Sequence, residues 1–202
     1  MNKAILISIE PSWCDMIAAG QKTIEVRKTK PKLETPFKCY IYCTNKRPFL
    51  VWGDVSHGNG ETEFTRLSGY SRKEAEKTWD IFNGKVMGEF ICNEIERFSV
   101  DPKYDNLTLS RMSRLSCAST PYLQDYASDC WLYGWHISDF KIYDEPLELS
   151  NFYVWKKCNS CRDAGYESTA CCYDEDCKVP AMITRPPQSW CYVEELKGGE
   201  EE

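Results

Sequence analysis

Hydrophobic and polar positions along the chain predict strands joined by short helices. An apolar run from Ala4 to Ile9 predicts an opening strand. Pro11 and Ser12 begin a helix, with Asp15 at the capping-box position behind Ser12, and Gly20 ends it. Apolar residues three and four positions apart give this helix one packing side. The helix therefore delivers the residues that follow it to a defined place.

The next segment alternates with the period of a strand. From Thr23 to Arg27, Ile24 and Val26 face one way, and Thr23, Glu25 and Arg27 share the other face. The pattern predicts a strand whose polar side is a candidate functional surface.

The remaining pattern is also rich in strands. Runs of β-branched and aromatic residues predict strands at Lys38–Thr44, Val86–Phe98, Trp131–Tyr143 and Ser189–Val193. Ser71, with Glu74 at the box position, begins a second helix that runs to Phe82, and Thr120 caps a third. The turn residues of Val55–Thr65 predict an exposed loop. Several strands with three brief helices favour a small β-barrel of the α+β class.

Length and composition fit a single domain spanning residues 1–202. Hydrophobic residues make up 42% of the 202 and charged residues 28%, enough apolar material for a real core. No apolar run approaches the roughly 18 residues that span a bilayer, and an acid interrupts the opening before a secretory segment forms. A cytoplasmic protein with no membrane partner is therefore expected, and its oligomeric state is left open.

Charge is unevenly distributed. The formal net charge is −6, but residues 21–47 hold eight bases and two acids, a local charge of +6, which leaves −12 for the remainder. One basic segment on an acidic protein offers an anion a single docking face. The alternative is that these lysines only aid solubility.

A motif lies at the start of this basic segment. The stretch AAGQKTIEVRK matches the pattern G-x-K-x-x-E-x-R with Gly20, Lys22, Glu25 and Arg27. This resembles the ASCH domain of the PUA-like superfamily, where the motif follows the first helix. The preceding ILISIEPSWCDMI and the later segments GKVMGEF, YGWHISDFKIYDEP and RPPQSWCYVEEL are similar to segments of bacterial and phage ASCH proteins. The resemblance covers most of the chain except a cysteine-rich window.

The resemblance implies a compact β-barrel with a cleft beside the first helix that holds RNA or a nucleotide. Lys22 is a point charge suited to phosphate, and Arg27 offers a planar fork for phosphate or a guanine edge. Glu25 would accept from an exocyclic amine or hold Arg27 in place. Lys28 adds charge, and Trp13 is the stacking candidate. The alternative is an ordinary surface ion-pair network, worth roughly 0 to 1 kcal/mol per pair.

A hydrolase acting on modified nucleosides or RNA through the same cleft is the alternative function. Some small relatives are amidohydrolases of acylated cytidine, whose implied catalytic set is Lys, Thr and Glu. Lys22 matches the lysine, but Glu25 stands where the nucleophilic threonine would lie, and Thr23 is out of register. The isolated His57 and His136 are more often structural than catalytic. No catalytic residue is therefore assigned.

The cysteine-rich window lies at residues 158–177. Five of the chain's twelve cysteines fall in it, and the others are scattered through apolar stretches as small buried hydrophobes. Cys158 and Cys161 form a CxxC, and Cys172 and Cys177 supply a second pair, so the window predicts an inserted finger with a structural Zn²⁺. Cys171 is an equal alternative to Cys172. Disulfides or free thiols compete with zinc, and a third hypothesis makes this insertion the working surface of an interaction protein.

Overall fold

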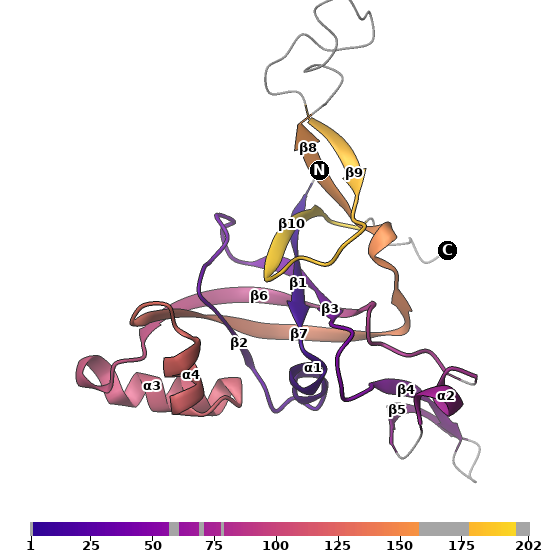
Figure 1. The fold of residues 1–202 in the computed structure, drawn as a ribbon, viewed down its shortest axis with the longest axis horizontal. Coiled ribbons are helices and arrows are strands. Elements are labelled where there is room, and N and C mark those ends of the chain that lie inside the picture. The colour runs from indigo at the N-terminus through magenta and orange to yellow at the C-terminus, as the bar shows by residue number, and fades with distance from the viewer. Residues whose placement is uncertain (1, 57–60, 69–70, 78, 158–177, 197–202) are drawn as a thin grey trace, which may run out of the picture.

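The computed structural model describes residues 2–56, 61–68, 71–77, 79–157 and 178–196. Its centre is a six-stranded sheet in the order β10-β1-β3-β6-β7-β2 (Figure 1). The strands are β1 (Lys3–Ile9), β2 (Ile24–Arg27), β3 (Phe37–Cys43), β6 (Val86–Ser99), β7 (Trp131–Leu147) and β10 (Trp190–Glu194). β1 and β3 are parallel, and the other neighbours are antiparallel. The fold is α+β with a core built mostly of sheet, as expected.

β1 has a core on each of its faces. Ile5 and Ile7 pack in one cluster with the first helix, whereas Ala4 and Leu6 pack in a second cluster on the opposite face. A strand buried on both faces needs a continuous apolar run rather than an alternating one. This explains why the opening strand was predicted correctly from its sequence.

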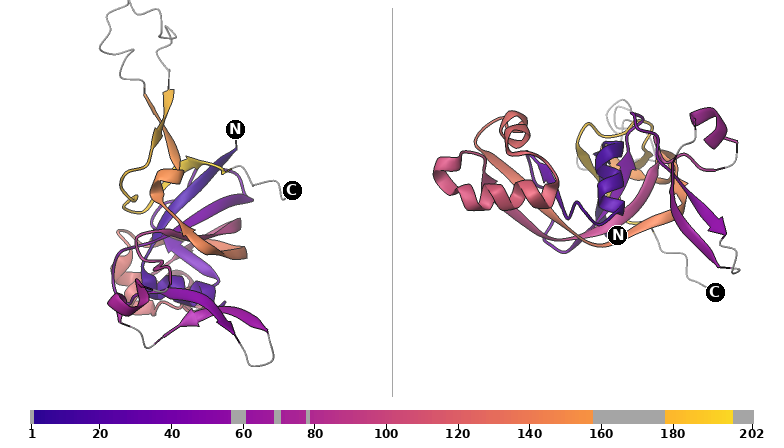
Figure 2. Two further views of the ribbon diagram at one scale, coloured as in Figure 1. Left: turned by 90° about the vertical axis from the view of Figure 1, so that its right-hand side faces the viewer. Right: turned by 90° about the horizontal axis from the view of Figure 1, so that it is seen from below.

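Along the curve of the long strands β6 and β7, α1 (Pro11–Ala18) lies between α3 (Pro102–Ser116) and α2 (Arg72–Ala75) (Figure 2). The predicted α1 is confirmed, but its N-cap is Glu10 and no side chain caps it, so the predicted Ser12 capping box is wrong. Pro11 occupies the first turn, where its missing N–H costs nothing.

The sequence analysis missed α3 (Pro102–Ser116). The pair Asp101 and Pro102 could have predicted its start, because the Asp101 side chain caps the helix by accepting from the backbone N–H of Lys103 and Pro102 occupies the first turn. Leu109 and Met112 pack with the following helix, α4 (Thr120–Tyr126), over the apolar face of β2. The cap of α4 is Ser119 rather than the predicted Thr120.

Two small sheets lie outside the main one. β4 (Val51–Ser56) and β5 (Thr62–Leu67) form an antiparallel pair, so the predicted exposed loop over this region is wrong for its described residues. The helix from Ser71 keeps its capping box but is a single turn, α2 (Arg72–Ala75). A 3-10 turn (Leu149–Asn151) precedes the second pair, β8 (Tyr153–Lys157) and β9 (Lys178–Met182), which projects from the domain (Figure 1).

The predicted barrel does not close. No backbone ladder joins the edge strands β2 and β10 in the described part of the chain, so the six strands form an open, curled sheet. Side chains link its edges instead: the indole of Trp190 donates to Thr29, and the hydroxyl of Tyr192 accepts from the amide of Lys32. None of the described helices is long and apolar enough to cross a membrane.

Candidate nucleotide-binding site

The junction between α1 and β2 fixes where the motif residues lie. Gly20 has a φ of +68°, a left-handed conformation that glycine adopts without strain, and it turns the chain at the helix end. The amides of Gln21 and Lys22 both donate to the carbonyl of Met16, at 2.9 and 3.0 Å. The amide of Thr23 then bonds to the carbonyl of Leu115. Backbone hydrogen bonds to α1 and to α3 therefore fix the three residues that lead into β2.

The structure brings together the three motif side chains. Lys22, Glu25 and Arg27 are 4%, 6% and 8% exposed. The Lys22 ammonium lies 3.2 Å from Glu25 Oε2, and Arg27 Nη2 lies 3.0 Å from Glu25 Oε1. The alternating pattern of the strand is thus confirmed, but its polar face is buried. An exposed surface network is therefore excluded.

Backbone groups from other elements hold both cations. Lys22 Nζ donates to the carbonyl of Ser116 at 3.0 Å, and Arg27 Nη2 donates to the carbonyl of Ser8 at 2.6 Å. Arg27 Nη1 reaches the hydroxyl of Ser189 at 3.4 Å. The protein itself therefore uses the outer nitrogens of the guanidinium, which the sequence analysis assigned to phosphate or guanine.

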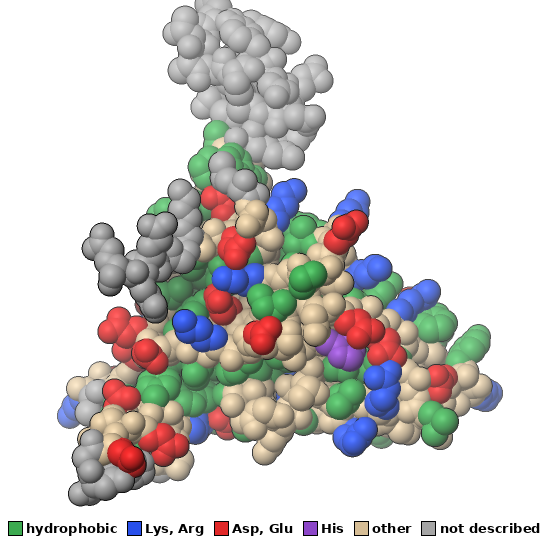
Figure 3. All heavy atoms as spheres, turned by 180° about the vertical axis from the view of Figure 1, so that it is seen from behind, with side chains coloured by type: hydrophobic (Ala, Val, Ile, Leu, Met, Phe, Trp, Pro, Cys, Tyr) green, Lys and Arg blue, Asp and Glu red, His purple; other side chains and the backbone are tan. Residues whose placement is uncertain are grey.

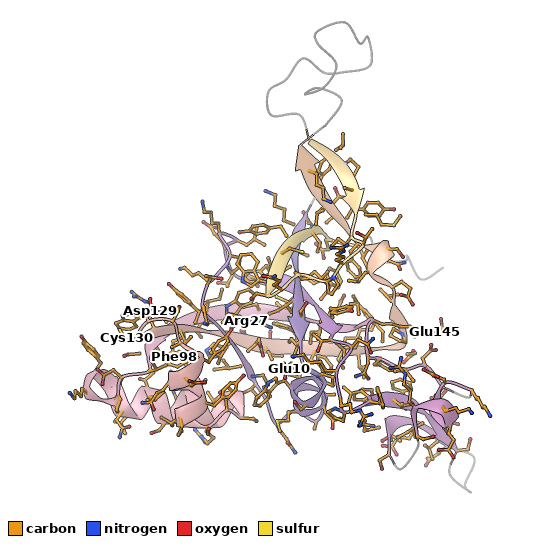
Figure 4. All side chains as sticks on the ribbon, in the orientation of Figure 1. Glu10, Arg27, Phe98, Asp129, Cys130 and Glu145 are labelled. Atoms are coloured by element: carbon orange, nitrogen blue, oxygen red, sulfur yellow. The ribbon has the colours of Figure 1, made fainter. Side chains whose placement is uncertain are left out.

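Lys22, Glu25 and Arg27 line one cavity of about 520 Å³. Its wall includes the end of β1, α1, β2, α4 and the loop after β3. Glu10 and Arg27, labelled in Figure 4, both belong to this wall. Lys46 also lines it and forms an ion pair with Glu10 at the surface. Three cations and two carboxylates thus give the lining a formal charge of +1.

Polar atoms without partners lie in this wall. Glu25 Oε2, Arg27 Nε and Thr44 Oγ1 are buried and have no hydrogen-bond partner in the described part of the protein. Most buried polar groups in folded proteins are hydrogen-bonded, so each exception calls for a reason. Glu25 Oε2 has the Lys22 ammonium 3.2 Å away, and all three atoms are sealed by the protein rather than exposed to the cavity.

Aromatic rings form another part of the cavity wall. Tyr122 and Tyr126 stack with their centroids 6.2 Å apart and their planes 4° apart, and Trp13 lies 6.0 Å from Tyr122. The Lys22 ammonium is 5.1 Å from the Trp13 ring. Burial raises the pKa of both Tyr122 and Tyr126, so these rings are neutral at physiological pH. Trp13 lies where the sequence predicts, whereas the tyrosines of α4 were missed.

One buried side chain fixes the loop after β3. Asn83 Oδ1 accepts from the amide of Leu50, and Asn83 Nδ2 donates to the carbonyls of Lys46 and Pro48. Thr44 and Lys46, which begin this loop, line the cavity. Asn83 therefore shapes the wall without touching the cavity.

Other predicted residues lie away from the cavity. Lys28 is exposed and does not line it, although its ammonium is 5.0 Å from the ring of Tyr126, which does. Thr23 is exposed as well. His136 Nε2 is 3.7 Å from Glu96 Oε2 on the neighbouring strand, a structural position. His57 lies outside the described residues.

Several scattered cysteines are buried, as predicted. Cys14, Cys39, Cys43 and Cys92 are packed in the main core as free thiols. Burial raises the pKa of Cys92 to about 12 and that of Cys14 and Cys39 well above 9.0, which keeps these thiols protonated. These residues act as small hydrophobes.

The predicted zinc ligands Cys158, Cys161, Cys172 and Cys177 lie outside the described residues. Among the residues that the structure describes, no group of three or more potential ligands could hold a metal ion. The register of β8 and β9 ends at Lys157 opposite Lys178, so the two residues that flank the window lie on neighbouring strands.

No family model matches the chain, and no curated protein matches it. Among solved structures, the crystal structure of ASCH from Zymomonas mobilis is similar, with a TM-score of 0.51 and 16% identity over 95% of this chain and 88% of that chain. Two variants of that protein give TM-scores of 0.50 and 0.51 at 15% and 16% identity, covering 96% and 95% of this chain and 92% and 89% of theirs. At such identity the likeness establishes the fold alone. The chain therefore has the fold of the ASCH domain, in agreement with the resemblance of its motifs.

Proposed function

We propose that this protein binds RNA or a nucleotide in the cavity beside α1. The observation that carries the proposal is that buried cations, a buried carboxylate and several aromatic rings line the same cavity. Its volume of about 520 Å³ is within the range of small-ligand pockets. The resemblance of the motif Gly20, Lys22, Glu25 and Arg27 to that of the ASCH domain supports the same class of function.

Each part of a nucleotide has a matching part of the wall. A base can stack on the Trp13 and Tyr122 rings, because every base has a π-face that an aromatic side chain can cover. Lys46 at the surface and Lys28 beside Tyr126 are placed to meet phosphates. On the face seen in Figure 3, basic and acidic side chains are intermingled, which offers phosphates no single basic patch there.

The proposal is tested by titrating the protein with nucleoside 5′-monophosphates and with a short RNA of mixed sequence at several salt concentrations. Affinity should fall as salt rises, by about one logarithmic unit of slope per phosphate contact. Tyr122→Ala should weaken binding by roughly 5- to 150-fold, because stacking contributes about 1 to 3 kcal/mol per base.

Tyr104→Ala is the matched control, since Tyr104 is also an exposed helical tyrosine but lies on α3 beside Trp131. Tyr104→Ala should bind as the wild type does. Equal weakening in both variants, or no binding of any nucleotide or RNA, would refute the proposal.

A hydrolase that uses the same cavity is the second candidate. It is favoured by the Lys22–Glu25 pair in the cavity wall, and Thr44, a hydroxyl residue that the sequence analysis did not consider, lines the same cavity. Incubation with acylated nucleosides and short RNAs tests it. Product formed by the wild type and abolished in Thr44→Val would make the protein an enzyme, whereas unchanged substrates would leave it a binding module.

We also propose that the 158–177 insertion holds a structural Zn²⁺ with Cys158, Cys161, Cys172 and Cys177. The pairing of β8 with β9 supports this, because it sets the flanking residues Lys157 and Lys178 opposite each other. Native mass spectrometry should find one zinc that Cys158→Ser loses. Disulfides in the window would refute the site.

A further inference from the structure

Three lysines at alternate positions follow β2 directly. We infer that Lys28, Lys30 and Lys32 bind the phosphates of an RNA chain that leaves the cavity, so that the partner of this protein is a polynucleotide rather than a free nucleotide. These three residues are called the lysine row below. The inference rests on the proposed function and adds to it the path of the ligand outside the cavity.

The protein does not compensate the charge of the lysine row. All three side chains are exposed, and none forms an ion pair with a residue that the structure describes. By contrast, Lys38 and Lys46 of the same basic segment each lie against a glutamate. Glu34, the next acid along the chain, lines a separate cavity. Three unpaired cations within five residues, on a protein whose formal net charge is −6, attract a partner with closely spaced negative charges.

The strand β10 holds the lysine row in place. The indole of Trp190 donates to the hydroxyl of Thr29 at 3.2 Å, and the hydroxyl of Tyr192 accepts from the amide of Lys32 at 2.7 Å. Pro31, within the row, is buried. The connection from β2 to β3 therefore lies against β10 with its lysines exposed (Figure 1). A segment that is already held in this way loses little freedom when a ligand binds.

The lysine row begins at the cavity. Lys28 directly follows Arg27, which lines the cavity, and the Lys28 ammonium is 5.0 Å from the ring of Tyr126, another part of the wall. Gln188 also lines the cavity, and the chain runs from it into β10, which holds the row. An RNA chain with one base in the cavity can therefore continue along β10 over the lysine row.

The type of side chain fits a sugar-phosphate backbone. A lysine ammonium is a mobile point charge that pairs with a phosphate, and such contacts carry no base sequence information. Lys30 and Lys32 do not line the cavity, so a nucleotide bound there leaves them unused. An RNA chain carries a charge at every nucleotide and reaches both. The lysine row should therefore strengthen the binding of longer ligands whatever their sequence.

Single-stranded RNA of increasing length tests the inference. The wild type and Lys30→Ala/Lys32→Ala are titrated with 5′-phosphorylated oligoadenylates and oligouridylates, from the mononucleotide upward, at several salt concentrations. Lys73→Ala/Lys77→Ala is the matched control, because it removes the same charge from two lysines that are also exposed. These control residues lie in and just after α2, far from the connection between β2 and β3 (Figure 1).

The affinity of the wild type should rise with RNA length. For the longer RNAs, Lys30→Ala/Lys32→Ala should lose roughly 25-fold at 0.1 M salt, because each contact with a single strand contributes about 0.7 units of slope over the decade of salt below 1 M. The slope itself should fall by about 1.4, equally for both sequences. Mononucleotide binding by this variant, and all binding by the control, should stay within about twofold of the wild type, since neither involves the lost phosphate contacts.

Affinity that does not depend on RNA length would overturn the inference, and so would longer RNAs that bind Lys30→Ala/Lys32→Ala as they bind the wild type or the control. In each case mononucleotide binding would leave the proposed function standing. Phosphatidylserine vesicles that bind through the lysine row, with no gain in affinity for longer RNA, would assign the row to a membrane surface and also overturn the inference. If neither mononucleotides nor RNA bind, the inference and the proposed function both fail.

Discussion

Glu25→Gln is expected to destabilise the protein strongly, because Glu25 is the only carboxylate that the described structure places against both Lys22 and Arg27. The substitution preserves the shape of the side chain and removes its charge. It leaves two buried cations, 4% and 8% exposed, on either side of a neutral amide.

The expected magnitude follows from burial. Removing one partner of a buried ion pair costs about 3 to 5 kcal/mol, because the remaining charge keeps its desolvation penalty without compensation. In a chain of this length, 1 kcal/mol lowers the Tm by about 2 to 4 °C, so the Tm should fall by roughly 6 to 20 °C. The backbone bonds to Ser116 and Ser8 retain part of the stability of the two cations.

Urea unfolding and thermal melts of the two proteins measure this difference. Glu76→Gln is the matched control, since Glu76 also pairs with an arginine, at 2.6 Å, but both side chains are more than 40% exposed. The control should stay within about 0.5 kcal/mol of the wild type. If the unfolding free energy of Glu25→Gln stays within about 1 kcal/mol of the wild-type value, the claim that the buried network depends on the charge of Glu25 is refuted.

Three further predictions concern stability. Asn83→Ala should cost about 1 to 3 kcal/mol in urea unfolding, because it removes the partners of three backbone groups in the loop at residues 46–50. Gly88→Ala should cost more than about 2 kcal/mol, because the added Cβ would lie 2.3 Å from the backbone oxygen of Lys141; an unchanged Tm would contradict that contact. Alkali should destabilise the fold, because burial raises the pKa of Cys92 from 9.0 to about 12. The contribution of the protonated thiol to the free energy of unfolding is therefore complete below pH 9.0 and is lost as the pH rises toward 12. Unfolding free energy that stays flat between those pH values would contradict the burial of the thiols.

Local patterns were sufficient for the strands of the main sheet. The apolar run of β1 predicted its burial, and the alternating residues of β2 predicted which side chains share a face, because side-chain direction in a strand follows sequence position. Sequence patterns were less informative where a segment's structure depends on the strand with which it pairs. Residues 51–56 and 62–67 are strands because they pair with each other, and Ile81 bridges to Val51; local propensity does not record either pairing.

For the candidate site, too, the sequence predicted one part and the tertiary structure decided the other. The sequence determined that a lysine, a glutamate and an arginine share the junction of α1 and β2, because those positions are neighbours along the chain. Tertiary structure alone decided that they are buried, that Ser8 and Ser116 hold the cations, and that Tyr122 of α4 and Thr44 complete the cavity. These contacts join residues far apart in sequence. Their energies depend on burial, which exists only once the sheet has curled around them.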